Sequence, residues 1–191
     1  MPDKNLPPRP TRLAHDLAAQ ALAPGDLAVD ATCGNGHDTL HLARLVGPHG
    51  TVVAIDVQAA ALDETQHRLE SERLADGRVR LLHACHASMG EHIAPATAAL
   101  AMFNLGYLPG GDHTLTTRVE TTTAALDAAA LILRPGGLLM VTCYPGHPEG
   151  AHEAEAVTVW MESAASHGAR VAQYAQPFTR KPAPMLWLMS P

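Results

Sequence analysis

Apolar segments rich in Val, Ile, Leu and Ala alternate along this chain with longer segments in which apolar residues recur at helical spacing. This alternation is typical of βα units whose strands lie side by side in a parallel sheet. Continuous apolar runs such as Val52–Ile55 and Leu138–Val141 indicate strands buried on both faces, because helices cover both sides of such a sheet. The pattern predicts strands at residues 26–31, 51–56, 79–83, 98–103, 137–143, 170–176 and 184–189, with helices near residues 11–23, 38–46, 58–74, 115–133 and 151–167.

Glycine and proline mark two of the predicted boundaries. Apolar residues from Leu115 to Leu133 keep to one helical face, and the Arg-Pro-Gly-Gly sequence at residues 134–137 is expected to end that helix. Pro182 and Pro184 flank the start of the last predicted strand. Because proline donates no ladder hydrogen bond, we expect this strand at a sheet edge or in an antiparallel hairpin.

Length and composition indicate one globular domain over residues 1–191, of which residues 1–10 are expected to be flexible. Hydrophobic residues make up 47% and charged residues 17% of the chain. No apolar run approaches the roughly 20 residues that span a bilayer. The first residues also lack the apolar centre of a signal peptide. We therefore expect a cytoplasmic protein that does not enter membranes.

The metal-ligating residue types show no metal-site spacing. Cys33, Cys85 and Cys143 are far apart and form no CxxC pair, so they predict reduced thiols. None of the twelve histidines belongs to an HExxH motif, and His83 with His86 lacks a nearby third ligand. The sequence predicts no metal site.

The formal net charge of −6 is unusual for a nucleic-acid enzyme, because Lys and Arg supply most of the affinity for phosphates. Charge alone favours a small substrate. Basic residues near the two ends, Arg9, Arg12, Arg180 and Lys181, fit either a local basic patch or ordinary surface charge.

The segment Val29–Thr39, with the sequence VDATCGNGHDT, runs from a predicted strand through a glycine turn into a helix. Gly34 and Gly36 allow a close backbone approach, and the start of the helix offers free N–H groups to a nucleotide-type ligand. The alternative is an ordinary tight turn. Thr39 stands where a dinucleotide-binding GxGxxG motif has its third glycine, which disfavours NAD.

Two acidic residues end neighbouring strands beside this turn. Asp56 lies twenty residues after Gly36, where its carboxylate can accept hydrogen bonds from ribose hydroxyls or cap a helix. Asp30 can position an amino acid part of the ligand, or accept backbone N–H bonds of the glycine loop. Cys85 and His86 follow the third predicted strand, where nucleotide-binding α/β folds usually contact adenine. Alternatively, His86 is an ordinary histidine on the protein surface.

The fourth strand leads into the polar, glycine-rich sequence NLGYLPGGDH at residues 104–113. Its start, Asn104 to Tyr107, resembles the Asn/Asp-Pro-Pro-aromatic motif of amino-group methyltransferases. In that motif an amide oxygen and a backbone carbonyl accept hydrogen bonds from the target nitrogen, and the aromatic ring packs on its base. Here Leu105 and Gly106 replace the two prolines.

An alkylammonium has no lone pair, so an amine acceptor must first lose a proton. The proton can pass to solvent or to Asp112, His113 or His147, and the sequence does not choose among them. Tyr144 or His147, in the loop after the fifth strand, could stack on a base. Each of these side chains also fits a loop cap, a rigid connection or a solvated surface.

The motifs DATCGNGHDT, AIDVQ, FNLGYLPGGDH and YPGHPEG, in this order, resemble the family described as "Putative rRNA methylase". Its YtqB-like members include the MnmM-type tRNA methyltransferases, and the resemblance extends roughly over residues 13–188. It implies a Rossmann-like class I methyltransferase with a seven-stranded, mostly parallel sheet, an antiparallel last strand and helices on both faces. It also implies S-adenosylmethionine as cofactor and tRNA as partner, with the 5-aminomethyl group of wobble 2-thiouridine converted to methylaminomethyl.

The same resemblance assigns residues to the two halves of the site. The expected cofactor residues are Asp30, Ala31, Gly34, Asn35, Gly36, His37, Asp38, Thr39, Asp56, Gln58, Cys85, His86 and Asn104. The expected catalytic residues at the substrate edge are Asn104, Tyr107, Asp112, His113, Tyr144 and His147.

Other functions stay open from the sequence. One is a methyltransferase of rRNA or of a small molecule, and another is a non-catalytic module that binds the cofactor. The polar segment that starts at Asn104 argues against the second, and Thr39 argues against a dehydrogenase. A homodimer would extend the surface of so small an enzyme, but the sequence does not test it.

Overall fold

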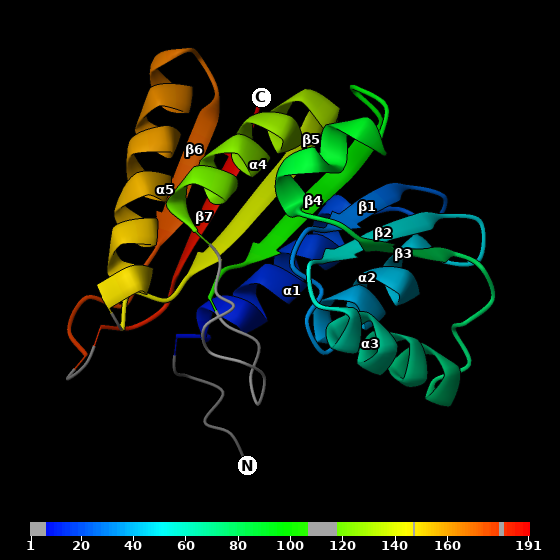
Figure 1. Ribbon diagram of the computed structural model, residues 1–191. Coiled ribbons are helices and arrows are strands. Elements are labelled where there is room, and N and C mark those ends of the chain that lie inside the picture. The colour runs from blue at the N-terminus through cyan, green and yellow to red at the C-terminus, as the bar shows by residue number, and fades with distance from the viewer. Residues whose placement is uncertain (1–6, 107–117, 147, 180–181) are drawn as a thin grey trace.

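A computed structural model describes residues 7–106, 118–146, 148–179 and 182–191. These residues form a seven-stranded sheet in the order β3-β2-β1-β4-β5-β7-β6, with helices on both faces (Figure 1). The strands are β1 (Leu27–Asp30), β2 (Thr51–Asp56), β3 (Val79–His83), β4 (Ala98–Asn104), β5 (Leu133–Cys143), β6 (Arg170–Tyr174) and β7 (Met185–Ser190). The helices are α1 (Pro10–Ala21), α2 (His37–Val46), α3 (Ala59–Ser71), the 3₁₀ helix η1 (His86–Glu91), α4 (Val119–Ile132) and α5 (Pro148–Ser166).

All neighbouring strands from β3 to β5 are parallel, and β7 pairs antiparallel with both β5 and β6. The chain order therefore reverses between β1 and β4. In open α/β sheets, ligands bind outside the carboxyl ends of the strands at such a reversal. This topology brings the residues that follow β1, β2, β4 and β5 to one edge.

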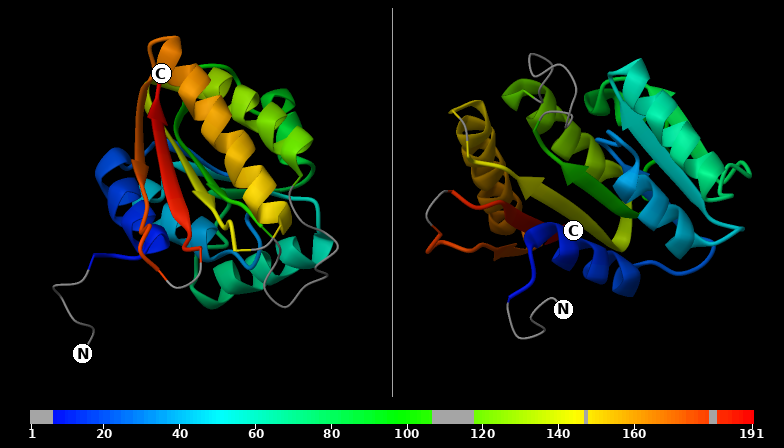
Figure 2. Two further views of the ribbon diagram at one scale, coloured as in Figure 1. Left: turned by 90° about the vertical axis from the view of Figure 1, so that its left-hand side faces the viewer. Right: turned by 90° about the horizontal axis from the view of Figure 1, so that it is seen from below.

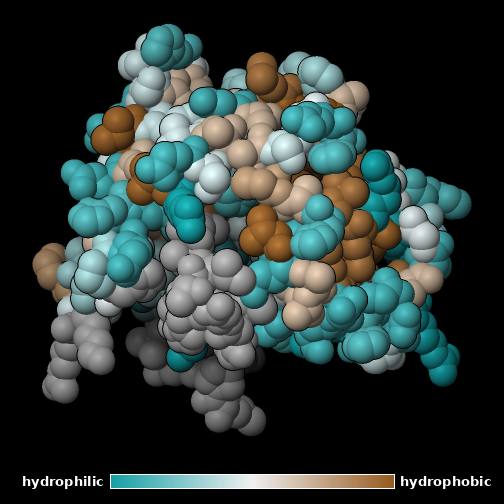
Figure 3. All heavy atoms as spheres, in the orientation of Figure 1, coloured by the Kyte–Doolittle hydropathy of each residue, from teal (hydrophilic) through white to brown (hydrophobic). Residues whose placement is uncertain are grey.

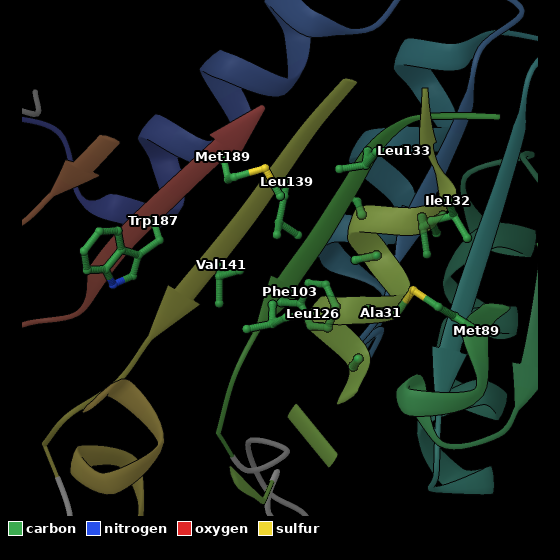
Figure 4. Close-up of a cluster of buried hydrophobic side chains, with 14 of the residues drawn as sticks. Ala31, Met89, Phe103, Leu126, Ile132, Leu133, Leu139, Val141, Trp187 and Met189 are labelled. Atoms are coloured by element: carbon green, nitrogen blue, oxygen red, sulfur yellow. The ribbon is translucent and has the colours of Figure 1, made fainter. Parts of the chain in front are cut away.

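Two apolar layers cover the sheet, in agreement with strands that are apolar on both faces. On one face, α1 and α2 pack through Ala14, Ala18 and Leu42 against strand residues such as Leu100. On the other, α4, α5 and η1 pack against side chains such as Phe103, Leu139, Val141 and Trp187 (Figure 4). Figure 2 shows α1 on one side of the sheet and α4 and α5 on the other.

Helix α3 illustrates how spacing selects the buried face. Its buried residues, Ala61, Leu62, Thr65 and Leu69, recur at helical spacing and turn toward the core. The remaining surface of α3 is largely hydrophilic (Figure 3). This orientation points Thr65 toward the turn that follows β1.

Most predicted elements form with ends shifted by a few residues, and one predicted boundary was wrong. Helix α4 ends at Ile132, and Leu133 already belongs to β5. Leu133 pairs with Ala98, whereas Leu138 pairs with Leu100, so the Arg-Pro-Gly-Gly sequence forms a bulge within the strand rather than a helix stop. Leu115 lies outside the described residues.

Two further elements bear on the sequence analysis: β7 takes one of its two expected placements, and η1 was not predicted. Strand β7 is in an antiparallel hairpin, as expected, but it lies between β5 and β6 and not at an edge. Pro182 and Pro184 precede its first residue, Met185, so every residue that pairs can donate to a ladder. The turn of 3₁₀ helix η1 was not predicted, because six residues give too short a periodic signal.

Candidate functional site

The turn after β1 is held in shape by the end of β2. Gly34 and Gly36 have positive φ angles of 50° and 76°, the left-handed region that favours glycine. The N–H of Gly34 donates to Asp56 Oδ2 at 2.9 Å, and the N–H of Gln58 donates to Asp56 Oδ1 at 2.9 Å. Each carboxylate oxygen has a further lone pair, so Asp56 can brace the turn and still accept hydrogen bonds from a ligand.

Helix α3 supports the same turn from behind. Thr65 Oγ1 donates to the Gly34 carbonyl at 3.0 Å, and Arg68 Nε donates to the Asn35 carbonyl at 2.6 Å. These bonds hold the carbonyl groups of the turn, and the N-cap residue of α2, Gly36, has no side chain that could cap the helix. The N-terminus of α2, at His37 and Asp38, is thus available to an anionic group.

Asp30 is fully buried beneath this turn. Its Oδ2 accepts a hydrogen bond from the Thr39 hydroxyl at 2.6 Å, and its Oδ1 accepts one from the Thr32 N–H at 3.3 Å. Burial raises the pKa of the Asp30 carboxyl to about 7, and the charge of Asp38 acts in the same direction. Thr39 is also buried, so in this structure it supports Asp30 rather than facing the sheet edge.

The other residues predicted to contact adenine or its surroundings lie around η1. His86 is 7% exposed, so the alternative of a surface histidine is wrong. Its ring lies 5.9 Å from that of Phe103, and burial lowers its pKa while a hydrogen bond to the backbone of Ala31 raises it. Ala31 is buried in the core, and Cys85 is half-buried.

Asn104 ends β4 at the centre of this edge. Its backbone N–H donates to Thr32 Oγ1 at 2.8 Å, and its side-chain Nδ2 donates to Asp38 Oδ2 at 3.4 Å. The Tyr144 hydroxyl shares a side-chain hydrogen bond with Asn104. Among the described residues, the buried Oδ1 of Asn104 has no hydrogen-bond partner. Because buried acceptors are nearly always paired in native proteins, this atom indicates a ligand position.

Tyr144 follows β5 and is half-buried beside Asn104. Burial raises the pKa of its hydroxyl, the charge of Asp38 acts in the same direction, and the hydrogen bond with Asn104 opposes both. The structure therefore brings together two of the six expected catalytic residues. The other four, Tyr107, Asp112, His113 and His147, lie outside the described residues.

Sequence reasoning missed several residues of this edge. His15, on α1, lies with its Nε2 atom 2.6 Å from Asp38 Oδ1, and its ring stacks on that of His41 with centroids 4.1 Å apart. Thr65 and Arg68 were assigned only to a helix. The position of His15 among the apolar residues of α1 was the one signal in the sequence that could have pointed to it. Its partner Asp38 lies 23 residues away, so spacing alone does not connect the two.

Metal ligands do not gather here or elsewhere in the part of the chain that the structure describes. No group of three or more His, Cys, Asp or Glu side chains there could hold a metal ion. Among the same residues, no helix is long and apolar enough to cross a membrane.

Comparisons with known proteins give consistent results. A family model described as "Putative rRNA methylase" matches residues 52–190. The chloroplastic tRNA (mnm(5)s(2)U34)-methyltransferase of Arabidopsis thaliana is 43% identical to this chain over 156 aligned residues. The alignment covers 77% of this chain but only 57% of the length of that relative. A "putative rRNA-methylase" from Clostridium thermocellum has a TM-score of 0.93 at 36% identity, covering 97% of this chain and 98% of its own. A "putative methyltransferase" from Streptococcus mutans, solved in complex with SAH, has a TM-score of 0.87 at 30% identity, covering 97% and 99%.

Proposed function

This chain belongs to the "Putative rRNA methylase" family, and we propose that it transfers a methyl group from S-adenosylmethionine to the 5-aminomethyl group of wobble 2-thiouridine in tRNA. The predicted fold class is confirmed, because solved methyltransferase structures superpose on 97% of the chain. The observation that carries the proposed reaction is the Asn104 amide, whose buried oxygen is unpaired among the described residues and lies beside the glycine turn.

The residues around the turn fit S-adenosylmethionine. Asp56 retains lone pairs for two ribose hydroxyls, and a Cβ at Gly36 would meet Thr65 at 2.7 Å, so the backbone there is tightly packed and can lie close to a ligand. The start of α2 suits the carboxylate of the amino acid part. Buried Asp30 stabilises the turn from below and can favour the nearby ammonium group. The SAH complex of the Streptococcus mutans relative supports this assignment.

Bound S-adenosylmethionine supplies a methyl group on a positively charged sulfur. The residues of this chain have to position an amine nitrogen in line with that methyl group and exclude water. Asn104 Oδ1 can accept an N–H bond from the amine, which directs the lone pair of the nitrogen away from the amide. The amine would first lose a proton to solvent so that its nitrogen has a lone pair. Methyl transfer would then form the N–C bond as the S–C bond breaks, leave the sulfur uncharged and place the positive charge on the methylated amine, which can lose a further proton to solvent.

The tRNA assignment rests on the relative from Arabidopsis thaliana, whose name specifies uridine 34 of tRNA. An exocyclic amine is also the acceptor that an amide oxygen suits best, because a ring carbon offers it no hydrogen bond. Tyr144, adjacent to Asn104, can pack on the base that carries the amine.

The deciding experiment incubates purified protein and S-adenosylmethionine with tRNA that carries 5-aminomethyl-2-thiouridine. Mass spectrometry of the digested nucleosides should show one added methyl group on that nucleoside. The same tRNA without the aminomethyl group, and rRNA, serve as matched controls and should stay unchanged. If another RNA or a small molecule gains the methyl group instead, the tRNA assignment is wrong and the methyl donor assignment survives.

A further inference from the structure

The side chains behind Asn104 form a continuous hydrogen-bonded group that links three elements. Asp38, at the start of α2, bonds through Oδ2 to Asn104 Nδ2 on β4 and through Oδ1 to His15 Nε2 on α1, at 3.4 and 2.6 Å. His15 in turn stacks on His41, with ring planes 8° apart, and its carbonyl lies 3.1 Å from His41 Nε2. We name His15, Asp38 and Asn104 the histidine relay.

The chemistry of the relay determines which way the Asn104 amide faces. An ionised carboxylate only accepts hydrogen bonds, so Asn104 must present its NH2 group to Asp38. Tyr144 lies beside this amide, and the Asn104 side chain acts to lower the pKa of its hydroxyl. With the NH2 group directed at Asp38, the amide oxygen is turned away from the carboxylate, and among the described residues it has no hydrogen-bond partner. A flipped amide would place an oxygen against the carboxylate and would be repelled.

His15 determines where the Asp38 carboxylate lies. His15 Nε2 forms a short hydrogen bond with Asp38 Oδ1, and the His15 ring is held in place by stacking on His41. Both His15 and Asp38 are partly shielded, with side chains 29% and 17% exposed, so water competes poorly for these bonds. The pair is linked to the proposed acceptor position through Asn104, whose Nδ2 donates to Asp38.

We propose that His15 is a positioning residue, which acts through Asp38 to keep the Asn104 amide oxygen directed at the acceptor nitrogen. This inference rests on the proposed function only in taking an amine as the acceptor. It predicts that His15 governs the methyl-transfer step and has little influence on the binding of the methyl donor.

The test uses His15→Ala, His15→Gln, Asp38→Asn, the double variant His15→Ala/Asp38→Asn, and His49→Ala as an exposed-histidine control. In single-turnover assays on the aminomethyl tRNA, His15→Ala should lose roughly tenfold to a hundredfold in rate, as for a reacting group misplaced by about 1 Å. In His15→Ala, S-adenosylmethionine affinity by calorimetry should change less than about threefold, since His15 lies on α1 and is not among the residues assigned to the donor. His15→Gln, which keeps an N–H donor, should recover most of the rate.

A purely structural role for His15 predicts other results. It would lower donor affinity and transfer rate together, would not be rescued by Gln, and would give additive losses in the double variant. The relay predicts that the double variant is no slower than Asp38→Asn, because both changes break one chain of contacts. Additive losses, or an unchanged rate in folded His15→Ala, would overturn the proposal.

A second measurement separates this inference from the proposed function. The side-chain amide signals of Asn104 in ¹H–¹⁵N spectra report its hydrogen bonds without any substrate. They should shift in His15→Ala and Asp38→Asn and stay in place in His49→Ala. Wild-type protein that leaves the aminomethyl uridine unmethylated would contradict the substrate assignment alone. Asn104 signals that are identical in His15→Ala and wild type would contradict the relay, whatever the substrate.

Discussion

The turn that we assign to the methyl donor depends on the absence of a side chain at Gly36, and an alanine there gives a quantitative test. Gly36 has a φ of +76°, and an added Cβ would lie 2.7 Å from Thr65 Oγ1, 2.9 Å from Thr65 Cγ2 and 3.0 Å from Thr65 Cα. The backbone cannot easily move away, because the Gly36 N–H donates to the Cys33 carbonyl and its own carbonyl accepts from the Leu40 N–H.

Gly136 is a matched control within the same chain. Its φ is +75°, and an added Cβ would have no atom within 4 Å. Gly136→Ala therefore meets only left-handed strain, which costs about 1–2 kcal/mol. Gly36→Ala meets the same strain and an overpacking cost of about 1–3 kcal/mol, so it should destabilise the fold by about 2–5 kcal/mol.

Urea unfolding followed by circular dichroism measures both losses, and calorimetry measures S-adenosylmethionine affinity. Only Gly36→Ala should weaken donor binding. Adding Thr65→Ala to Gly36→Ala removes two of the three close atoms and should restore part of the stability, after the effect of Thr65→Ala alone is subtracted. Equal destabilisation by the two glycine variants would refute the argument that Thr65 requires a glycine in this turn.

Four further variants test the neighbouring residues. Asp56→Ala should weaken donor binding and destabilise the turn, because both backbone N–H bonds to the carboxylate are lost. Asp56→Asn should lose less stability, because its amide oxygen keeps one acceptor. Equal donor affinity of wild type and both variants by calorimetry would exclude a ribose contact. Asn104→Ala should lower the single-turnover rate at least tenfold more than donor affinity, since its free atom faces the acceptor; equal losses would make it a cofactor residue. The pKa of Asp30 is about 7 in the folded protein and 3.8 in the unfolded chain, so folding takes up a proton between these pH values. The stability that Asp30 contributes is therefore complete below about pH 3.8 and is lost as the pH rises toward 7. Asp30→Asn should therefore gain stability relative to wild type as the pH rises from about 4 to about 7 in urea unfolding, and a constant difference would contradict the raised pKa.

The fold was largely predictable because its local signals agree with one another. Strands such as Thr51–Asp56 and Val79–His83 are continuous apolar or alternating runs between clear turns, and the structure has them at the predicted residues. Predicted helix and strand ends were wrong where pairing between strands outweighed a local sequence signal. The Arg-Pro-Gly-Gly sequence reads as a helix end, but pairing of Leu133 with Ala98 carries the strand back past it.

The candidate site also has a part that the sequence predicts and a part that it does not. Asp30, Asp56 and the glycine turn lie within about thirty residues of one another, and their spacing follows from one βαβ unit. His15 could not be predicted, because its contact with Asp38 depends on how α1 packs beside α2 on one face of the sheet. Contacts within one βαβ unit can be predicted from residue spacing, whereas contacts between helices that are distant in the sequence require the structure.

Charge places a last constraint on how this chain would bind tRNA, the substrate that we propose for it. Five of its arginines pair with carboxylates in the described structure, and Arg12 with Asp16 and Arg134 with Asp26 are examples. Arg9 and Arg118 take part in none of these pairs, and both stand at the carboxyl edge of the sheet, at the starts of α1 and α4. Because five described arginines already pair with carboxylates and the formal net charge is −6, we expect phosphate contacts to supply only part of the affinity for the proposed tRNA; Arg180 and Lys181 lie outside the described residues. Contacts of the modified base with Asn104 and Tyr144, as we propose them, would supply a further part and would distinguish this substrate from other RNA.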